Sequence, residues 1–194
     1  MTPNTSSSKD ADRLPPGQYL ARDFPVLHVG SPPHFDEKKW RLRIFGEVET
    51  PVELTWSAFT ALKTKQITTD IHCVTRWSKF DTVWEGVPFA DVIQLVKPKS
   101  AVRFVVTHGA NGYTANVPLD VANDDDVLLA WRYDRKPLEP VHGGPMRMFV
   151  PKRYFWKSTK WCDGVEFINE DRPGFWEVRG YNNSGDPWKE ERYW

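Results

Sequence analysis

The chain is poor in cysteine, since only Cys73 and Cys162 among its 194 residues carry a thiol. The two lie 89 positions apart, which is neither a zinc-ligand spacing nor a CxxC redox pair. A chain of this length can bury a sizeable core without a disulfide, although a bridge between the two thiols remains open. The sequence therefore argues against a small zinc-stabilised or disulfide-stabilised fold.

Long apolar runs and an excess charge are also missing. No stretch reaches the ~18 apolar residues of a membrane helix, and the N-terminus has neither an apolar signal region nor a twin arginine. Lys plus Arg and Asp plus Glu both number 26, so no overall charge attracts nucleic acid or anionic lipid. We expect a soluble, cytoplasmic protein with reduced thiols and no direct membrane insertion.

Several catalytic motifs are absent from the sequence. It has no GxGxxG, no Walker lysine and no GxSxG, which argues against dinucleotide-binding, P-loop and α/β-hydrolase sites. The three consecutive acids Asp124 to Asp126 indicate a solvated turn rather than a metal site.

Aromatic residues are abundant instead, with ten tryptophans in the chain. Residues 1–17 are polar and predict a disordered tail, and residues 18–194 predict a single domain. Strands are predicted within 39–48, 67–74, 101–109, 111–120, 126–138, 143–151 and 162–169, and short helices within 55–63 and 87–98. This pattern indicates an α+β fold with a β-rich core, short helices and long irregular loops.

Cys73 follows Ile71 and His72, where a predicted strand ends. Such a cysteine is a buried apolar filler, a nucleophile or a ligand, and the nearby His72 and Arg76 favour a thiolate. The role of Arg76 remains open: it acts on the thiolate, faces a substrate entrance or caps a surface turn.

A basic segment runs from His142 to Trp161. No acid lies between Pro140 and Cys162, whereas the segment contains Arg147, Lys152, Arg153, Lys157 and Lys160. Its glycines and hydroxyl groups favour a phosphate-binding site; a solvated loop and a single-stranded nucleic-acid groove are the alternatives. No RNA-binding motif supports the groove, so we expect no nucleic-acid partner. The glycine-rich segment 107–113 is either a plain turn or one wall of a ligand site.

Taken in chain order, these segments resemble the molybdenum-cofactor domain of the sulfite oxidase family. In that family a lone cysteine ends a strand, and a Trp-x-Gly-Val/Phe pattern that opens a helix follows it. Cys73 and residues 84–88 match these two features. Its His/Asn-Gly-x-Pro-x-Arg stretch leading into Val-Pro is matched by residues 142–151, and its segment ending in a cofactor-holding lysine by residues 158–161. The resemblance covers residues 19–188.

The resemblance implies a molybdenum–molybdopterin cofactor (Mo-MPT) with Cys73 as the thiolate ligand of the metal. The other cofactor contacts that it implies are Arg22, Thr107, His108, His142, Arg147, Ser158, Thr159 and Lys160. Arg22 and Tyr181 would also act on the substrate, although Asp23 and Phe24 stand where the family usually has Asn and His.

The implied activity is that of a molybdopterin-dependent oxidoreductase, which exchanges an oxygen atom and two electrons with a small oxyanion or an S- or N-oxide. The electrons would pass to or from a separate partner, such as a cytochrome, a flavoprotein or a quinone-linked subunit. The compact form is similar to bacterial single-domain members, including the catalytic subunit of the periplasmic methionine sulfoxide reductase, and it predicts a monomer. A non-catalytic molybdopterin carrier is the alternative.

Overall fold

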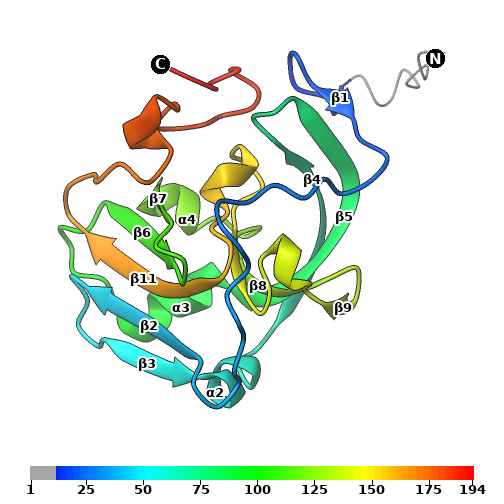
Figure 1. Ribbon diagram of the computed structural model, residues 1–194. Coiled ribbons are helices and arrows are strands. Elements are labelled where there is room, and N and C mark those ends of the chain that lie inside the picture. Colours follow the sequence, from blue (N-terminus) through cyan, green and yellow to red (C-terminus); the bar gives the residue numbers. More distant parts are fainter. Residues whose placement is uncertain (1–11) are drawn as a thin grey trace.

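Two β-sheets form the frame of the computed structural model, which describes residues 12–194 (Figure 1). The first sheet has the order β1-β5-β8-β10, with β4 paired to β5 and β9 paired to β8. Its strands are β1 (Tyr19–Leu20), β4 (Lys65–His72), β5 (Trp77–Pro88), β8 (Leu128–Tyr133), β9 (Lys136–Pro137) and β10 (Arg147–Phe149). Strand β1 runs parallel to β5, and the other pairs are antiparallel.

The second sheet has the order β3-β2-β11-β6-β7. Its strands are β2 (Arg41–Gly46), β3 (Val52–Thr55), β6 (Phe104–Gly109), β7 (Thr114–Pro118) and β11 (Cys162–Ile168). Figure 1 shows β11 between β2 and β6, parallel to the first and antiparallel to the second. This placement brings the basic segment before β11 into the centre of the molecule.

The helices are short. They are α2 (Trp56–Thr60), α3 (Phe89–Val96) and α4 (Leu119–Ala122), with the 3₁₀ turns η1 (Pro140–His142), η2 (Phe155–Lys157) and η3 (Glu177–Arg179). Thr55 caps α2: its hydroxyl accepts a hydrogen bond from the Ala58 amide at 3.2 Å. In the described part of the chain, none of the helices has the length and apolar character needed to span a bilayer. The predicted α+β class with a β-rich core is confirmed.

The buried apolar side chains form two clusters. One is largely aliphatic and includes Leu42, Val105 and Val165 from the second sheet. The other is aromatic and surrounds Cys73; in it, Trp84 is fully buried and stacks on Phe149 with ring centroids 4.4 Å apart. Burying each large side chain contributes roughly 1.5–3 kcal/mol, so the aromatic cluster gives the cysteine loop a rigid support.

Strand β5 corrects one prediction. Residues 84–88 are the last part of this strand, not a turn that opens a helix, and α3 begins only at Phe89. Gly86 is present because β5 and β8 approach closely there: a Cβ at this position would lie 2.3 Å from the Leu129 carbonyl oxygen. The glycine therefore serves strand packing at a register shift rather than a turn.

The N-terminal boundary also differs from the prediction. Residues 1–11 of the predicted tail lie outside the described residues, but residues 12–17 are ordered. Arg13 forms ion pairs with Asp70 at 2.6 Å and Asp81 at 2.8 Å, and Arg192 donates to the Pro16 carbonyl at 3.2 Å. Figure 1 accordingly shows β1 and the C-terminal segment at the same end of the molecule.

Candidate cofactor site

A pocket of about 230 Å³ opens beside the loop that joins β4 to β5. Its lining comes from five stretches of chain, within residues 24–29, 73–77, 111–113, 147–161 and 176–181. The predicted residues Cys73, Arg147, Ser158, Lys160 and Tyr181 all line it. The fold thus brings together side chains that are more than 100 positions apart.

Cys73 is held in the pocket lining by a tight turn. Its amide donates to the Trp77 carbonyl at 2.8 Å, and its own carbonyl accepts from the Arg76 amide at 3.0 Å. Arg76 closes the turn with a left-handed φ of 76°; its side chain is exposed and does not line the pocket. The structure therefore favours the third reading of Arg76, as part of a surface turn.

The two thiols differ in their surroundings, and both are free. Burial raises the pKa of the Cys73 thiol, while the Thr75 hydroxyl, 3.2 Å from the sulfur, and the charges of Arg192 and Lys160 lower it. Cys162 is fully buried in β11, where burial raises its pKa to about 12. Only Cys73 faces the pocket, so Cys162 acts as a core residue.

Arg147 is a fully buried cation in the pocket lining. Its Nη1 donates to the His142 carbonyl at 2.8 Å and its Nη2 to the Ser158 carbonyl at 2.5 Å, while its Nε has no partner. Burial lowers the pKa of Arg147 to about 9. Among the described residues no carboxylate pairs with this guanidinium, so the chain itself leaves its charge uncompensated.

Lys160, like Arg147, donates its hydrogen bonds to backbone carbonyls, but at a less buried position. Its Nζ donates to the carbonyls of Leu27 at 2.7 Å and Val141 at 2.6 Å. Burial, followed by the charge of Arg147, lowers the pKa of Lys160 to about 7. Gly143, at φ 108°, allows the backbone around it to approach Lys160 closely, because a Cβ at position 143 would lie 3.0 Å from the Lys160 Cγ.

The hydroxyl residues divide into two layers. Ser158 lines the pocket, and its Oγ accepts from the Val150 amide at 2.9 Å. Thr159 and Thr107 lie outside the lining, and their hydroxyls bond to each other at 2.6 Å in a fully buried contact. The predicted cofactor contacts of Thr107 and Thr159 are therefore indirect: the pair links β6 to the cofactor-facing segment.

Neither predicted histidine lines the pocket. His142 stacks on Phe24, with ring centroids 3.9 Å apart, and its Nδ1 is buried without a partner. The His108 Nε2 lies 2.9 Å from the Glu166 carboxylate of strand β11. The structure thus places His108 away from the pocket lining, and His142 packs against Phe24, which does line the pocket.

Arg22 also lies away from the pocket lining. Its side chain is exposed and absent from the pocket lining, where Phe24 and Pro25 stand instead. Phe24 packs its ring against an aromatic cluster that includes Trp77 and Phe155, and this burial leaves Arg22 in solvent. An apolar ring thus occupies the position that the resemblance had assigned to polar groups.

Aromatic residues complete the pocket. Trp176 stacks on Tyr181 with ring centroids 4.8 Å apart, and the Trp156 ring meets Tyr181 edge-on at 5.1 Å. All three line the pocket, as do Asn111 and Tyr113 of the glycine-rich segment. That segment is thus one wall of a site rather than a plain turn.

The basic segment does not form an open groove for nucleic acid. Arg147 and Lys157 are each only 1 % exposed, and Lys152 pairs with Asp124 at 2.9 Å. A nucleic-acid groove requires exposed cations along a strand path, so this alternative loses its basis.

Comparison with known proteins decides the family. A family model described as the oxidoreductase molybdopterin binding domain matches residues 28–176. The chain is also 40% identical over 190 residues to the uncharacterised oxidoreductase YuiH of Bacillus subtilis, covering 97% of this chain and 96% of YuiH. The chain belongs to this family. It is a molybdopterin-dependent oxidoreductase, and its cofactor is molybdenum–molybdopterin.

More distant relatives agree in fold. The catalytic subunit MsrP of the protein-methionine-sulfoxide reductase of Campylobacter jejuni is 27% identical over 161 residues, covering 74% of this chain and 54% of MsrP. The sulfane dehydrogenase SoxCD of Paracoccus pantotrophus superimposes with a TM-score of 0.66 at 18% identity, covering 77% of this chain and 42% of that chain. At this identity the SoxCD match establishes the fold alone, which is the predicted sulfite oxidase type.

The pocket fits this cofactor. Arg147 and Lys160 bring buried positive charge that, in the described part of the chain, is met only by carbonyl oxygens, and the Arg147 Nε lacks an acceptor. The pterin phosphate supplies anionic acceptors of the kind these groups require. Residues 12–194 contain no cluster of three or more His, Cys, Asp or Glu side chains for a metal, so a single thiol matches a metal whose other ligands come from the cofactor.

Proposed function

We propose that this protein exchanges an oxygen atom and two electrons with a neutral substrate that carries an S–O or N–O group. In the reducing direction the S–O or N–O bond breaks, and the oxygen leaves as water after taking up two protons. The two electrons come, one at a time, from a separate redox partner. The bound molybdenum centre supplies the two-electron oxygen-atom chemistry; the chain supplies binding, orientation and a dry pocket.

Cys73 is the proposed metal ligand. Its thiol lines the pocket, and a soft thiolate suits a metal that already has sulfur ligands. Metal binding deprotonates a thiol outright, so the burial that raises the pKa of Cys73 does not oppose this role. The Thr75 hydroxyl, 3.2 Å from the sulfur, is placed to donate to the thiolate and fix its direction.

Arg147, Ser158 and Lys160 are the proposed holders of the anionic part of the cofactor. The two cations line the same pocket, and within residues 12–194 neither is paired with an acid, so an anion there gains charge-assisted hydrogen bonds. Thr159 acts through its bond to Thr107 by keeping the segment in place. The same anion would raise the lowered pKa values of Arg147 and Lys160, since it favours their charged forms.

The observation that carries the choice of substrate is the aromatic part of the pocket lining. Phe24, Trp156 and Trp176 offer apolar surface, and the two cationic residues of the lining are already assigned to the cofactor. A free oxyanion buried there would lack a compensating charge. A neutral oxide needs only one hydrogen-bond donor for its oxygen and apolar surface for its substituents.

Tyr181 is the proposed donor. Its ring lines the pocket between Trp156 and Trp176. Burial raises the pKa of the Tyr181 phenol above its ordinary value of 10.0, so the hydroxyl keeps its proton at neutral pH. Arg22 has no part in this proposal, because it does not line the pocket.

The names of relatives support the substrate class and the need for a partner. MsrP and the putative YedZ1 of Azospira oryzae are both named as protein-methionine-sulfoxide reductase subunits. For this chain we propose a monomeric, cytoplasmic catalytic protein that meets its redox partner in solution. Cell fractionation and sedimentation of the full chain test these two properties; recovery from the periplasm or a stable dimer would overturn them.

The direct test is turnover by protein expressed with molybdate. With a reduced dye as electron source, we expect reduction of small sulfoxides or N-oxides to exceed oxidation of sulfite with an oxidised acceptor. Tyr181→Phe removes the donor and lowers kcat/KM by about 10²–10³. Faster turnover of sulfite than of every neutral oxide, or an unchanged Tyr181→Phe variant, would contradict the proposal.

A further inference from the structure

A buried ion pair lies behind the aromatic wall of the pocket. It joins Lys157, the last residue of η2, to Glu177, the first residue of η3, with 2.6 Å between Nζ and Oε1. The two side chains are only 1% and 2% exposed. Neither residue lines the pocket, so the site described above does not account for the pair.

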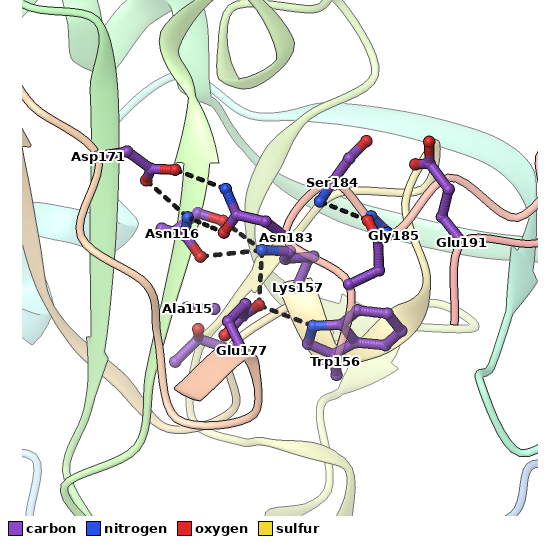
Figure 2. Close-up of polar contacts among 12 residues, drawn as sticks. Ala115, Asn116, Trp156, Lys157, Asp171, Glu177, Asn183, Ser184, Gly185 and Glu191 are labelled. Atoms are coloured by element: carbon purple, nitrogen blue, oxygen red, sulfur yellow. Dashed lines mark hydrogen bonds and ion pairs between the residues drawn. The ribbon is translucent and has the colours of Figure 1, made fainter. Parts of the chain in front are cut away.

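The pair is the centre of a polar network that Figure 2 shows. Lys157 Nζ also donates to the Asn116 carbonyl at 3.0 Å and to its side-chain oxygen at 2.9 Å, so all three of its donors are used. Asn116 Nδ2 in turn donates to Asp171 at 2.7 Å and to Asn183 at 2.8 Å. The network therefore ties strand β7 to the C-terminal segment on both sides of Glu177.

Each end of the pair is adjacent in sequence to a residue of the pocket wall. Trp156 precedes Lys157, and Trp176 precedes Glu177. The Trp156 Nε1 also donates to Glu177 Oε1 at 2.8 Å, so one carboxylate oxygen fixes both the lysine and the indole. Two amides of the η3 region then fix Tyr181: Gly180 N donates to the Glu177 carbonyl at 3.2 Å and Tyr181 N to the Trp176 carbonyl at 3.1 Å.

Stability alone does not explain the pair. Replacing a buried ion pair with apolar residues of similar volume is often neutral or stabilising, whereas an ion pair imposes a direction on both partners. Among the described residues, the second oxygen of Glu177 is buried and has no hydrogen-bond partner, which adds a cost that a purely stabilising contact would avoid. The arrangement instead fixes the relative position of two short turns that have few regular hydrogen bonds of their own.

We propose that Lys157 and Glu177 are positioning residues that set Trp156, Trp176 and Tyr181 against the pocket and thereby tune substrate binding. The inference rests on the proposed function, because it takes Tyr181 as the substrate-facing donor. Neither residue touches the substrate or the cofactor; they act through the three aromatic side chains.

The test uses the full-length holoprotein with Lys157→Met and, because a lone buried Glu177 endangers folding, the double variant Lys157→Met/Glu177→Gln. In the double variant no unpaired charge remains, and the introduced glutamine can still accept a hydrogen bond from Trp156. Lys152→Met is the matched control, since Lys152 lies five positions away in a half-exposed pair. We expect unchanged molybdenum and pterin content in all folded variants, and a KM for the neutral oxide raised about tenfold in the ion-pair variants only.

A double-mutant cycle separates positioning from a general loss of stability. If Lys157 acts through Tyr181, the loss of kcat/KM caused by Lys157→Met/Glu177→Gln shrinks in a Tyr181→Phe background, whereas independent effects multiply. Equal losses in both backgrounds would overturn the proposal.

Hydrogen exchange provides a readout independent of turnover. Peptides covering residues 174–183 are expected to lose protection in the ion-pair variants, while peptides from β4 and β5 keep theirs. Unchanged protection in residues 174–183 would contradict the positioning role. Wild-type protein that turns over no neutral oxide would instead contradict the proposed function, so the two failures are distinguishable.

Discussion

Two buried cations of the same segment, Arg147 and Lys157, have opposite electrostatic surroundings. Both are 1% exposed, and burial lowers the pKa of each. The Nζ of Lys157 lies 2.6 Å from the Glu177 carboxylate, and the negative charge of that carboxylate partly restores the pKa of Lys157. Arg147 has backbone carbonyls and an unused Nε. Lys157 is neutralised by a carboxylate of the described chain, whereas Arg147 is left to pair with the anion of a ligand.

This difference distinguishes a cation with a structural role from a cation that binds a ligand. A cation whose hydrogen bonds and charge are satisfied within the fold can only hold parts of the chain together, as Lys157 holds β7 and η3. A cation that is buried without an acid is costly unless a ligand completes it. Lys160, which also contacts only carbonyls and has its pKa lowered to about 7, belongs with Arg147.

The largest expected effect comes from breaking the satisfied pair. Lys157→Met leaves the Glu177 carboxylate buried without its counter-charge, and this should lower the free energy of unfolding by about 3–5 kcal/mol. Lys157→Met/Glu177→Gln should recover a large part of that loss. Urea unfolding measures both variants; equal stability of the wild type and Lys157→Met would show that the pair is not electrostatically coupled.

A smaller effect is expected from the unsatisfied cation. Arg147→Met removes a charged donor from the proposed cofactor site, which should weaken binding of the anion by about 1.5–3 kcal/mol, or roughly ten- to a hundredfold. Arg147→Lys keeps the charge and should retain more cofactor. Molybdenum and pterin content per folded chain are the measurements, and wild-type content in Arg147→Met would place the anion elsewhere.

The smallest expected effect comes from the exposed ion pair between Glu166 and Arg172, which serves as a comparison for the buried pair of Lys157 and Glu177. Burial alone would raise the pKa of Glu166, but hydrogen bonds from Arg172 and His108 lower it below its ordinary value of 4.5. A carboxyl with a lowered folded-state pKa stabilises the fold above pH 4.5 and loses that contribution as the pH falls through the folded-state value.

Because Arg172 is half exposed, the contribution of Glu166 should be at most about 1 kcal/mol. Glu166→Gln should therefore lower the free energy of unfolding slightly at pH 7 and flatten its decrease below pH 4.5. Urea unfolding between pH 3 and 7 checks this. A loss at pH 7 as large as that of Lys157→Met would remove the distinction between buried and exposed pairs.

Local patterns predicted much of the fold and part of the site. Strand β4 ends at His72 as the sequence indicates, and the cap of α2 at Thr55 follows from a local hydrogen bond. Strand β5 was missed because residues 84–88 were assigned to the opening of a helix, whereas the role of Gly86 depends on the approach of Leu129 from β8. A contact between distant strands cannot be deduced from the local pattern.

The same limit applies to the site. Cys73, Arg147, Ser158, Lys160 and Tyr181 were placed by motif order, and the structure brings all of them to one pocket. Phe24 and Trp176 were not singled out as wall residues, because nothing in their own segments shows that they meet. Arg22 was assigned from its neighbours in sequence, whereas in the structure its side chain is exposed and Phe24 lines the pocket.

The account depends most directly on Cys73 as the metal ligand. The decisive measurement is molybdenum analysis and X-ray absorption at the molybdenum edge for wild type, Cys73→Ala and Cys162→Ala, each expressed with molybdate. The account predicts molybdenum and pterin in the wild type, an unchanged spectrum for Cys162→Ala, and loss of one sulfur ligand or of the metal in Cys73→Ala. A Cys73→Ala variant that keeps its metal with an unchanged spectrum, or a wild type without molybdenum, would contradict it.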